Sequence, residues 1–166
     1  MIILHTSRIR VYYEDTDAGG IVYYANYLRF FERARTDWLR DLGLGQRALL
    51  ADEGLGFVVR DCTMQYQRPA RLDDELAVDV AVEQPDRDFR RASMRFVQRA
   101  TRTSDATTLV SGTVRIACVL HATGRPAPIP DWLIDRMQAL PATRSADRAP
   151  PLPAAGPAAR TAESSA

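Results

Sequence analysis

The sequence predicts an α+β domain in which an antiparallel sheet of about five strands packs against one long helix. A wide apolar stripe recurs at steps of three and four residues from Tyr27 to Leu42, which is typical of an amphipathic helix. One segment before this helix and several after it alternate polar with apolar residues, as half-buried strands do. Turn-forming residues separate the later segments from one another. One long helix with a run of strands indicates the α+β class.

Length and composition limit the number of domains and the kinds of partner that the chain can have. A chain of 166 residues is expected to form one domain, and a hydrophobic content of 46% suits a globular core. The formal net charge of +1 gives no argument for a nucleic-acid partner or a membrane surface. Cys62 and Cys118 are isolated from each other and from His, so we expect two reduced, buried thiols. With no signal peptide and no long apolar run, we expect a cytoplasmic protein without membrane insertion.

The first strand is predicted over residues 6–13, and the helix follows. In the strand, Ile9, Val11 and Tyr13 share one face, while Arg8 and Arg10 occupy the other. The face of the helix that should enter the core carries Tyr27, Phe30, Phe31, Ala34, Trp38 and Leu42. Gly43 then supplies a natural helix end.

Four more strands and a short helix are predicted after that point. The strands cover residues 57–67, 75–84, 89–102 and 107–120. Their buried faces are expected to carry Val58, Cys62, Met64 and Tyr66 in the first; Leu76, Val78, Val80 and Val82 in the second; Ala92, Met94 and Phe96 in the third; Val110, Val114, Ile116, Cys118 and Leu120 in the fourth. The short helix covers residues 131–140 and buries Trp132, Leu133 and Met137.

The composition changes near residue 140. Residues 141–166 are rich in Pro, Ala, Arg and Ser and have almost no large apolar side chain. Such a segment cannot bury enough surface to offset its ordering entropy. We therefore predict a domain over residues 1–140 and a disordered tail over residues 141–166.

The segment from Asp15 to Gly20 carries two carboxylates and two glycines immediately before the predicted helix. It faintly resembles a calcium-binding loop, but Gly19 and Asn26 stand where that loop needs oxygen ligands, so we predict no metal site. Two interpretations remain open from the residues alone. Asp17 is either a structural residue that caps the helix or a catalytic carboxylate beside the N–H groups at the helix start.

A longer motif surrounds this segment. It reads Tyr13-x-Asp15-Thr16-Asp17-x-x-Gly20-x-Val22-Tyr23-x-x-x-Tyr27-x-x-Phe30-x-Glu32-x-Ala34-Arg35, and is followed by Phe57-Val58-Val59-Arg60 and Tyr66-x-x-Pro69-Ala70-Arg71-Leu72-Asp73-Asp74. The pattern resembles the hotdog-fold acyl-CoA thioesterases, both the Tol–Pal-associated YbgC-type enzymes and the 4-hydroxybenzoyl-CoA thioesterases. The resemblance implies a sheet wrapped around the central helix and an active site at a subunit interface.

Positions in this motif imply site residues. Asp17 matches the second Asp of Asp-Thr-Asp and is the expected catalytic carboxylate, acting as a general base or as a nucleophile. The backbone N–H of Tyr24 is the expected oxyanion donor. Tyr13, Gly20, Tyr23 and Asn26 are expected to shape the substrate site, while Asp15 supports the loop.

One position departs from the YbgC pattern. Those enzymes commonly carry His directly after the aromatic residue that aligns with Tyr23, whereas this chain has Tyr24, as in the 4-hydroxybenzoyl-CoA branch. The chemistry would then rest on Asp17 and the backbone.

A CoA substrate also needs cations for its phosphates. Arg87, Arg90 and Arg91 cluster after a turn and are candidate contacts, with a solvated strand end as the alternative.

The expected function is hydrolysis of an acyl-CoA to a carboxylic acid and CoA, without a cofactor. The expected partners are the acyl-CoA, a second copy in a homodimer or homotetramer, and an acyl carrier protein. The alternative is a non-catalytic acyl-CoA or acyl-carrier-protein binding module in an envelope or lipid-synthesis complex.

Overall fold

The computed structural model describes residues 3–83 and 92–139. Its elements are β1 (Ile3–Arg10), the short 3-10 helix η1 (Tyr13–Asp15), α1 (Asn26–Asp41), α2 (Gln46–Glu53), β2 (Leu55–Tyr66), β3 (Glu75–Val82), β4 (Ser93–Arg102), β5 (Thr108–Leu120) and α3 (Asp131–Ala139). The predicted tail over residues 141–166 and the candidate contacts Arg87, Arg90 and Arg91 lie outside the described residues.

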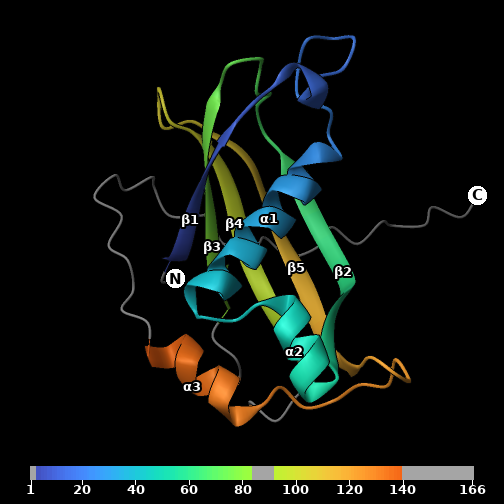
Figure 1. The fold of residues 1–166 in the computed structure, drawn as a ribbon. Helices are drawn as coiled ribbons and strands as arrows, with labels where there is room; N and C mark the ends of the chain where they lie inside the picture. Colours follow the sequence, from blue (N-terminus) through green and yellow to red (C-terminus); the bar gives the residue numbers. More distant parts are fainter. Residues whose placement is uncertain (1–2, 84–91, 140–166) are drawn as a thin grey trace, which may run out of the picture.

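The five strands form one antiparallel sheet in the order β1-β3-β4-β5-β2. The α1 helix lies along one face of this sheet, while α2 and α3 lie near one end of it (Figure 1). This confirms the predicted class and the arrangement that the hotdog resemblance implies. None of the helices in the described part of the chain is long and apolar enough to span a membrane.

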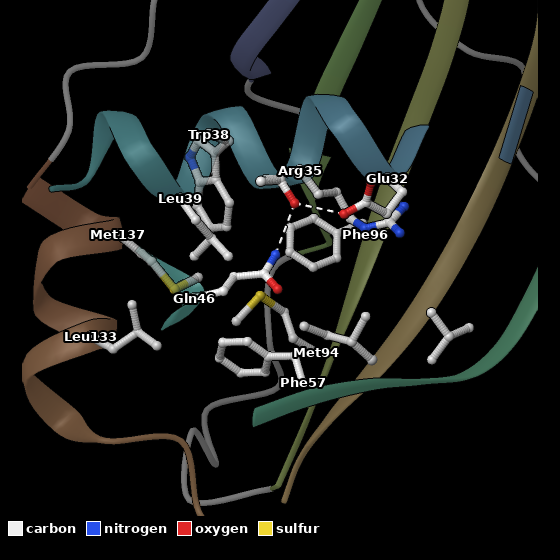
Figure 2. Close-up of a pocket in the computed structure, with 13 residues that line it drawn as sticks. Glu32, Arg35, Trp38, Leu39, Gln46, Phe57, Met94, Phe96, Leu133 and Met137 are labelled. Atoms are coloured by element: carbon white, nitrogen blue, oxygen red, sulfur yellow. Dashed lines mark hydrogen bonds between the residues drawn. The ribbon is translucent and has the colours of Figure 1, made fainter. Parts of the chain in front are cut away.

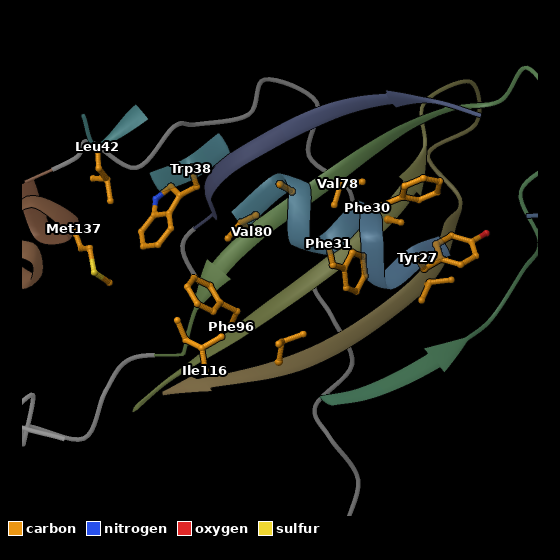
Figure 3. Close-up of a cluster of buried hydrophobic side chains, with 14 of the residues drawn as sticks. Tyr27, Phe30, Phe31, Trp38, Leu42, Val78, Val80, Phe96, Ile116 and Met137 are labelled. Carbon is orange, nitrogen blue, oxygen red and sulfur yellow. The ribbon is translucent and has the colours of Figure 1, made fainter. Parts of the chain in front are cut away.

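The core lies between α1 and the sheet (Figure 3). Every residue predicted for the buried helix face is buried, and Phe31 and Ala34 are fully enclosed. On β3, Leu76, Val78 and Val80 face the helix with no exposed surface. Gly43 adopts a φ of 74° directly after the last turn of α1, as predicted for a helix end. Burial of these aromatic and aliphatic side chains is the main force that holds α1 on the sheet.

A buried polar side chain also ties α1 to the sheet. Gln98 on β4 is 1% exposed, and its Nε2 donates to the backbone oxygen of Phe31 at 3.0 Å. Its Oε1 accepts a 2.6 Å hydrogen bond from Nη1 of Arg35. Burial lowers the pKa of Arg35, which nevertheless remains far above neutral pH. The pairing satisfies both groups inside the domain, where an unpaired polar atom would be costly.

Two strand predictions are wrong in detail. The strand predicted over residues 6–13 ends at Arg10, because Tyr13 begins η1; the Tyr13 side chain is 83% exposed instead of half-buried. In β2 the register with β5 shifts between Val59 and Asp61. This bulge changes the alternation, so Val59 and not Val58 shares the inner face with Cys62, Met64 and Tyr66.

Several burial predictions also need correction. Cys118 is buried as predicted, but Cys62 is exposed because it lies on the edge strand β2. Leu120 is 43% exposed, since β5 ends there and the chain turns away. The α2 helix was not predicted; it begins after Gly45 and ends at Gly54, which has a φ of 64°.

Candidate active site

The Asp15–Gly20 segment forms a tight loop that is tied to the start of α1. The backbone oxygen of Asp15 accepts hydrogen bonds from the N–H of Tyr23 at 2.9 Å and from Nδ2 of Asn26 at 3.0 Å. The N–H of Val22 donates to the backbone oxygen of Ala70. This hydrogen bond holds the residues after the loop against the connection between β2 and β3. The loop therefore sits at the helix N-terminus as a consequence of several backbone hydrogen bonds.

The two aspartates of the loop have different surroundings. Asp15 is 7% exposed, and its Oδ2 accepts the N–H of Tyr12 at 2.9 Å. This is the placement expected of a residue that supports the loop. Asp17 is exposed; its Oδ1 accepts only a short-range hydrogen bond, from the N–H of Gly19 at 2.8 Å, among the contacts that the described residues make. One oxygen of Asp17 thus remains open to an incoming molecule.

A β-turn presents the Asp17 side chain. The N–H of Gly20 donates to the backbone oxygen of Asp17 at 2.9 Å, and the N–H of Asp17 donates to the oxygen of Ile21. Gly20 has a φ of 71°, a backbone conformation that side-chain-bearing residues rarely adopt. At Gly19, a Cβ would lie 3.1 Å from Oδ1 of Asp17. Both glycines are needed to bring the chain close around this carboxylate.

The start of α1 offers a backbone donor. The N–H of Tyr23 is already committed to Asp15, whereas within residues 3–83 and 92–139 no acceptor takes the N–H of Tyr24. N–H groups at a helix start point outward and carry partial positive charge. The geometry therefore leaves Tyr24 as a donor for an oxygen that approaches from solvent.

An aromatic cluster surrounds this donor. The rings of Tyr23 and Tyr24 lie 4.6 Å apart, and Tyr24 makes an edge contact with Tyr66 at 6.3 Å. The side-chain interaction with Tyr24 favours the neutral phenol of Tyr23 and raises the pKa of Tyr23, while burial raises the pKa of Tyr66. Both phenols thus stay protonated at neutral pH. The Tyr13 side chain, earlier in the chain, is 83% exposed.

The residues predicted for the site differ in how exposed they are. Tyr13, Gly20, Tyr23 and Tyr24 are exposed around the loop, but Asn26 is 8% exposed and its amide nitrogen is used by Asp15. The side chain of Asn26 therefore supports the loop, and any effect of Asn26 on a substrate is indirect. The contact roles of all five residues stay predictions.

Two residues that belong to the motif, but to which the sequence analysis gave no role in the site, are near the site. Tyr66 Oη donates to the backbone oxygen of Tyr24 at 3.2 Å, across 42 positions of sequence. Arg71 pairs with Ile21 in an isolated bridge, which places an exposed arginine beside the turn that carries Asp17. An aromatic at a strand end and an arginine in a connection gave no signal on their own, because only the tertiary fold brings them to the loop.

Comparison with known proteins identifies a family. Residues 11–137 match the model of the thioesterase-like superfamily. The chain is 44% identical over 122 residues to the acyl-CoA thioesterase YbgC of Haemophilus influenzae, a match that covers 74% of this chain and 85% of that protein. It is 42% identical over 126 residues to the acyl-CoA thioester hydrolase YbgC of Escherichia coli O6:H1, covering 76% and 90%.

Solved structures show the same fold. A probable thioesterase from Bartonella henselae superposes with a TM-score of 0.69 at 35% identity, covering 76% of this chain and 98% of that one. A 1,4-dihydroxy-2-naphthoyl-CoA thioesterase from Synechocystis superposes with a TM-score of 0.74, covering 82% and 96%. At 20% identity the second likeness concerns the fold alone.

Proposed function

Because the chain belongs to the thioesterase-like superfamily, we propose that it hydrolyses an acyl-CoA through Asp17 and the backbone N–H of Tyr24. The enzyme class, acyl-CoA thioester hydrolase, is that of its curated relatives. The observation that carries the proposed roles is the contrast between the two loop aspartates: Asp15 is enclosed and Asp17 is exposed beside the helix start.

Thioester hydrolysis needs a carboxylate that acts at the carbonyl carbon and a donor that binds the carbonyl oxygen. An exposed aspartate is ionised at neutral pH in the absence of a strong perturbation. The thioester oxygen would accept the N–H of Tyr24, where the helix dipole favours the negative charge that develops in the transition state. Loss of one such donor costs about 3–4 kcal/mol in catalysis.

Two routes use the same carboxylate. As a general base, Asp17 removes a proton from water, which attacks the carbonyl carbon while the CoA thiolate leaves. As a nucleophile, Asp17 attacks the carbonyl itself, the thiolate leaves, and water hydrolyses the resulting mixed anhydride. A single turnover in ¹⁸O-labelled water tests the second route: label in the Asp17 carboxylate shows that a mixed anhydride formed and was opened at the Asp17 carbon, because the general-base route labels only the free acid.

The experiment that tests this function is release of free thiol from a panel of short-chain, long-chain and aromatic acyl-CoAs. We expect turnover of at least one of them by the wild-type protein. Binding of acyl-CoA across the panel without thiol release would instead indicate the non-catalytic binding module. A cytoplasmic location and an acyl-carrier-protein partner stay predictions that this panel does not address.

Tyr66 is expected to hold the backbone of Tyr24 in place from the peptide that follows the donor N–H. Its hydroxyl contacts the backbone oxygen of Tyr24, so Tyr66→Phe removes one hydrogen bond and keeps the ring. We expect kcat to fall about fivefold with little change in KM, equivalent to about 1 kcal/mol. Steady-state kinetics with Tyr12→Phe, an exposed tyrosine outside the cluster, gives the control. An unchanged kcat in Tyr66→Phe would contradict this role.

We also propose that the protein works as a homodimer or a homotetramer. β2 is an edge strand whose Val58, Val59 and Tyr66 side chains are 47%, 57% and 49% exposed. Tyr24, shortly before α1, and Leu28 on α1 are exposed as well. An uncovered apolar edge strand is a template for pairing, and a second copy would cover it beside the start of α1.

Sedimentation tests the oligomer. We expect the wild-type protein to sediment above the monomer mass and Val58→Asp to shift it toward the monomer, because a charge on β2 opposes strand pairing. Leu50→Asp on α2, at a residue 36% exposed and away from the strand edge, is the control. A monomeric wild-type protein at micromolar concentration would contradict the proposal.

A further inference from the structure

A cavity of about 110 Å³ lies beside the second half of α1 (Figure 2). Its walls come from α1, α2, β2, β4, β5 and α3 and are mainly apolar, with Phe57, Met94, Phe96, Ile116, Leu133 and Met137 among them. Asp17 does not line it. An apolar cavity of roughly 150 Å³ stays dry and binds a molecule such as benzene, so this one has room for a few carbons.

The charged and amide side chains at its rim have hydrogen-bond partners, whereas Nε1 of Trp38, which also lines the cavity, has none among the described residues. Nε2 of Gln46 donates to Oγ1 of Thr36 at 2.8 Å, and this hydroxyl donates to Oε1 of Glu32 at 2.7 Å (Figure 2). The guanidinium of Arg35 is held by Gln98 and lies 6.0 Å above the ring of Phe96. Since these groups have partners already, the cavity favours an apolar ligand over a polar one.

A row of side chains on β2 leads from the cavity toward the candidate active site. Val59 lines the cavity, and Cys62, Met64 and Tyr66 follow it along the inner face of β2, each paired with an inward-facing position of β5. Tyr66 at the end of this row contacts Tyr24. On α1, Leu28 lies four residues before Glu32 and so on the same side of the helix as the cavity rim. From Asn26 to Leu39, at the far end of the cavity, the helix rises about 20 Å.

We propose that this cavity receives the distal end of a straight aliphatic acyl chain whose thioester lies at Asp17 and Tyr24. The inference rests on the proposed function and adds a substrate class to it: unbranched chains long enough to follow the row of β2 side chains into the cavity. Ile116 on β5 and Leu133 on α3 both line the cavity and determine how much of the chain is accepted. Each methylene group that becomes buried raises kcat/KM by up to about fourfold.

The first test measures kcat/KM for straight-chain substrates from acetyl-CoA to palmitoyl-CoA. The wild-type protein should prefer the longer members. Ile116→Phe fills the cavity and should lower kcat/KM for palmitoyl-CoA at least tenfold relative to butyryl-CoA. Val119→Phe places the same side chain on the opposite face of β5 and should keep the wild-type profile. Thermal melts establish that each variant folds, and Met94→Phe replaces Ile116→Phe if that variant does not.

The second test needs no catalysis. Free decanoate should raise the melting temperature of the wild-type protein and of Asp17→Asn, but not that of the filled variant. A flat chain-length profile in the wild-type protein, or an identical profile in Ile116→Phe, overturns the inference and leaves the proposed function intact. If no acyl-CoA is hydrolysed but decanoate stabilises the wild-type protein and Asp17→Asn and not the filled variant, the proposed function fails and the apolar site stands.

Discussion

Replacement of Asp17 by Asn is expected to lower kcat for acyl-CoA hydrolysis by at least about 100-fold, since general-base catalysis contributes about 10²–10⁴-fold. Asn keeps the Oδ1 atom that accepts the N–H of Gly19, so the β-turn should survive. It lacks the charge and basicity that either proposed route requires. KM should change little, because the carboxylate acts on the transition state more than on the bound substrate.

Glu14→Gln is the matched control for this variant. Glu14 lies in the same loop, is exposed and carries the same charge. If the effect of Asp17→Asn came only from the electrostatic field of the loop, Glu14→Gln would reproduce a large part of it. We expect Glu14→Gln to retain a rate within about twofold of wild type, equivalent to about 0.4 kcal/mol. Comparable losses in both variants would contradict a specific role for Asp17.

Gly112→Val is expected to destabilise the domain more than any other single change considered above. A Cβ on Gly112 would lie 2.6 Å from the backbone oxygen of Thr63 and 2.7 Å from Sδ of Met64. Met64 is flexible, but the oxygen of Thr63 belongs to β2, which pairs with β5 along its whole length. Overpacking of this kind costs about 1–3 kcal/mol, and the two further methyl groups of valine add to it. We expect a loss of about 3 kcal/mol and a melting temperature about 10 °C lower.

Gly56→Val is the control for the stability experiment. Gly56 also lies in a strand of the sheet, but a Cβ there would meet no atom within 4 Å. Its effect on the free energy of unfolding should stay within about 0.5 kcal/mol. Chemical denaturation of both variants measures the difference. Equal stability of the two variants would mean that β2 moves away from β5 without cost, against the close pairing of these strands.

The sequence predicted the α1 helix and the inner faces of β3 and β4 well, because their residues keep one period throughout. Trp38 and Phe31 are buried where a step of three or four places them, and Val78 and Val80 follow strict alternation. The prediction for the inner face of β2 was wrong at Val58, because a bulge inserts one residue without changing the residue types around it. The early end of β1 depends on the hydrogen bond from Tyr12 to Asp15, which periodicity does not report.

The candidate site was predictable only in part. The Asp-Thr-Asp motif pointed to Asp17, and the structure separates it from Asp15 by burial. Tyr66 and Arg71 stand in the quoted motif but reach the loop through the pairing of distant segments, so the local pattern did not assign them to the site. Beyond α1, the cavity is assembled from five further elements, including α2, whose short and weakly patterned sequence was not recognised as a helix.

The most direct test of the central claim compares single-turnover thiol release by wild type and Asp17→Asn with the acyl-CoA fully bound. Binding is measured first by calorimetry, so that both proteins are saturated before the reaction is followed. The account predicts similar dissociation constants and a chemical step at least about 100-fold slower in Asp17→Asn. Equal single-turnover rates in the two saturated proteins would show that Asp17 is not the catalytic carboxylate.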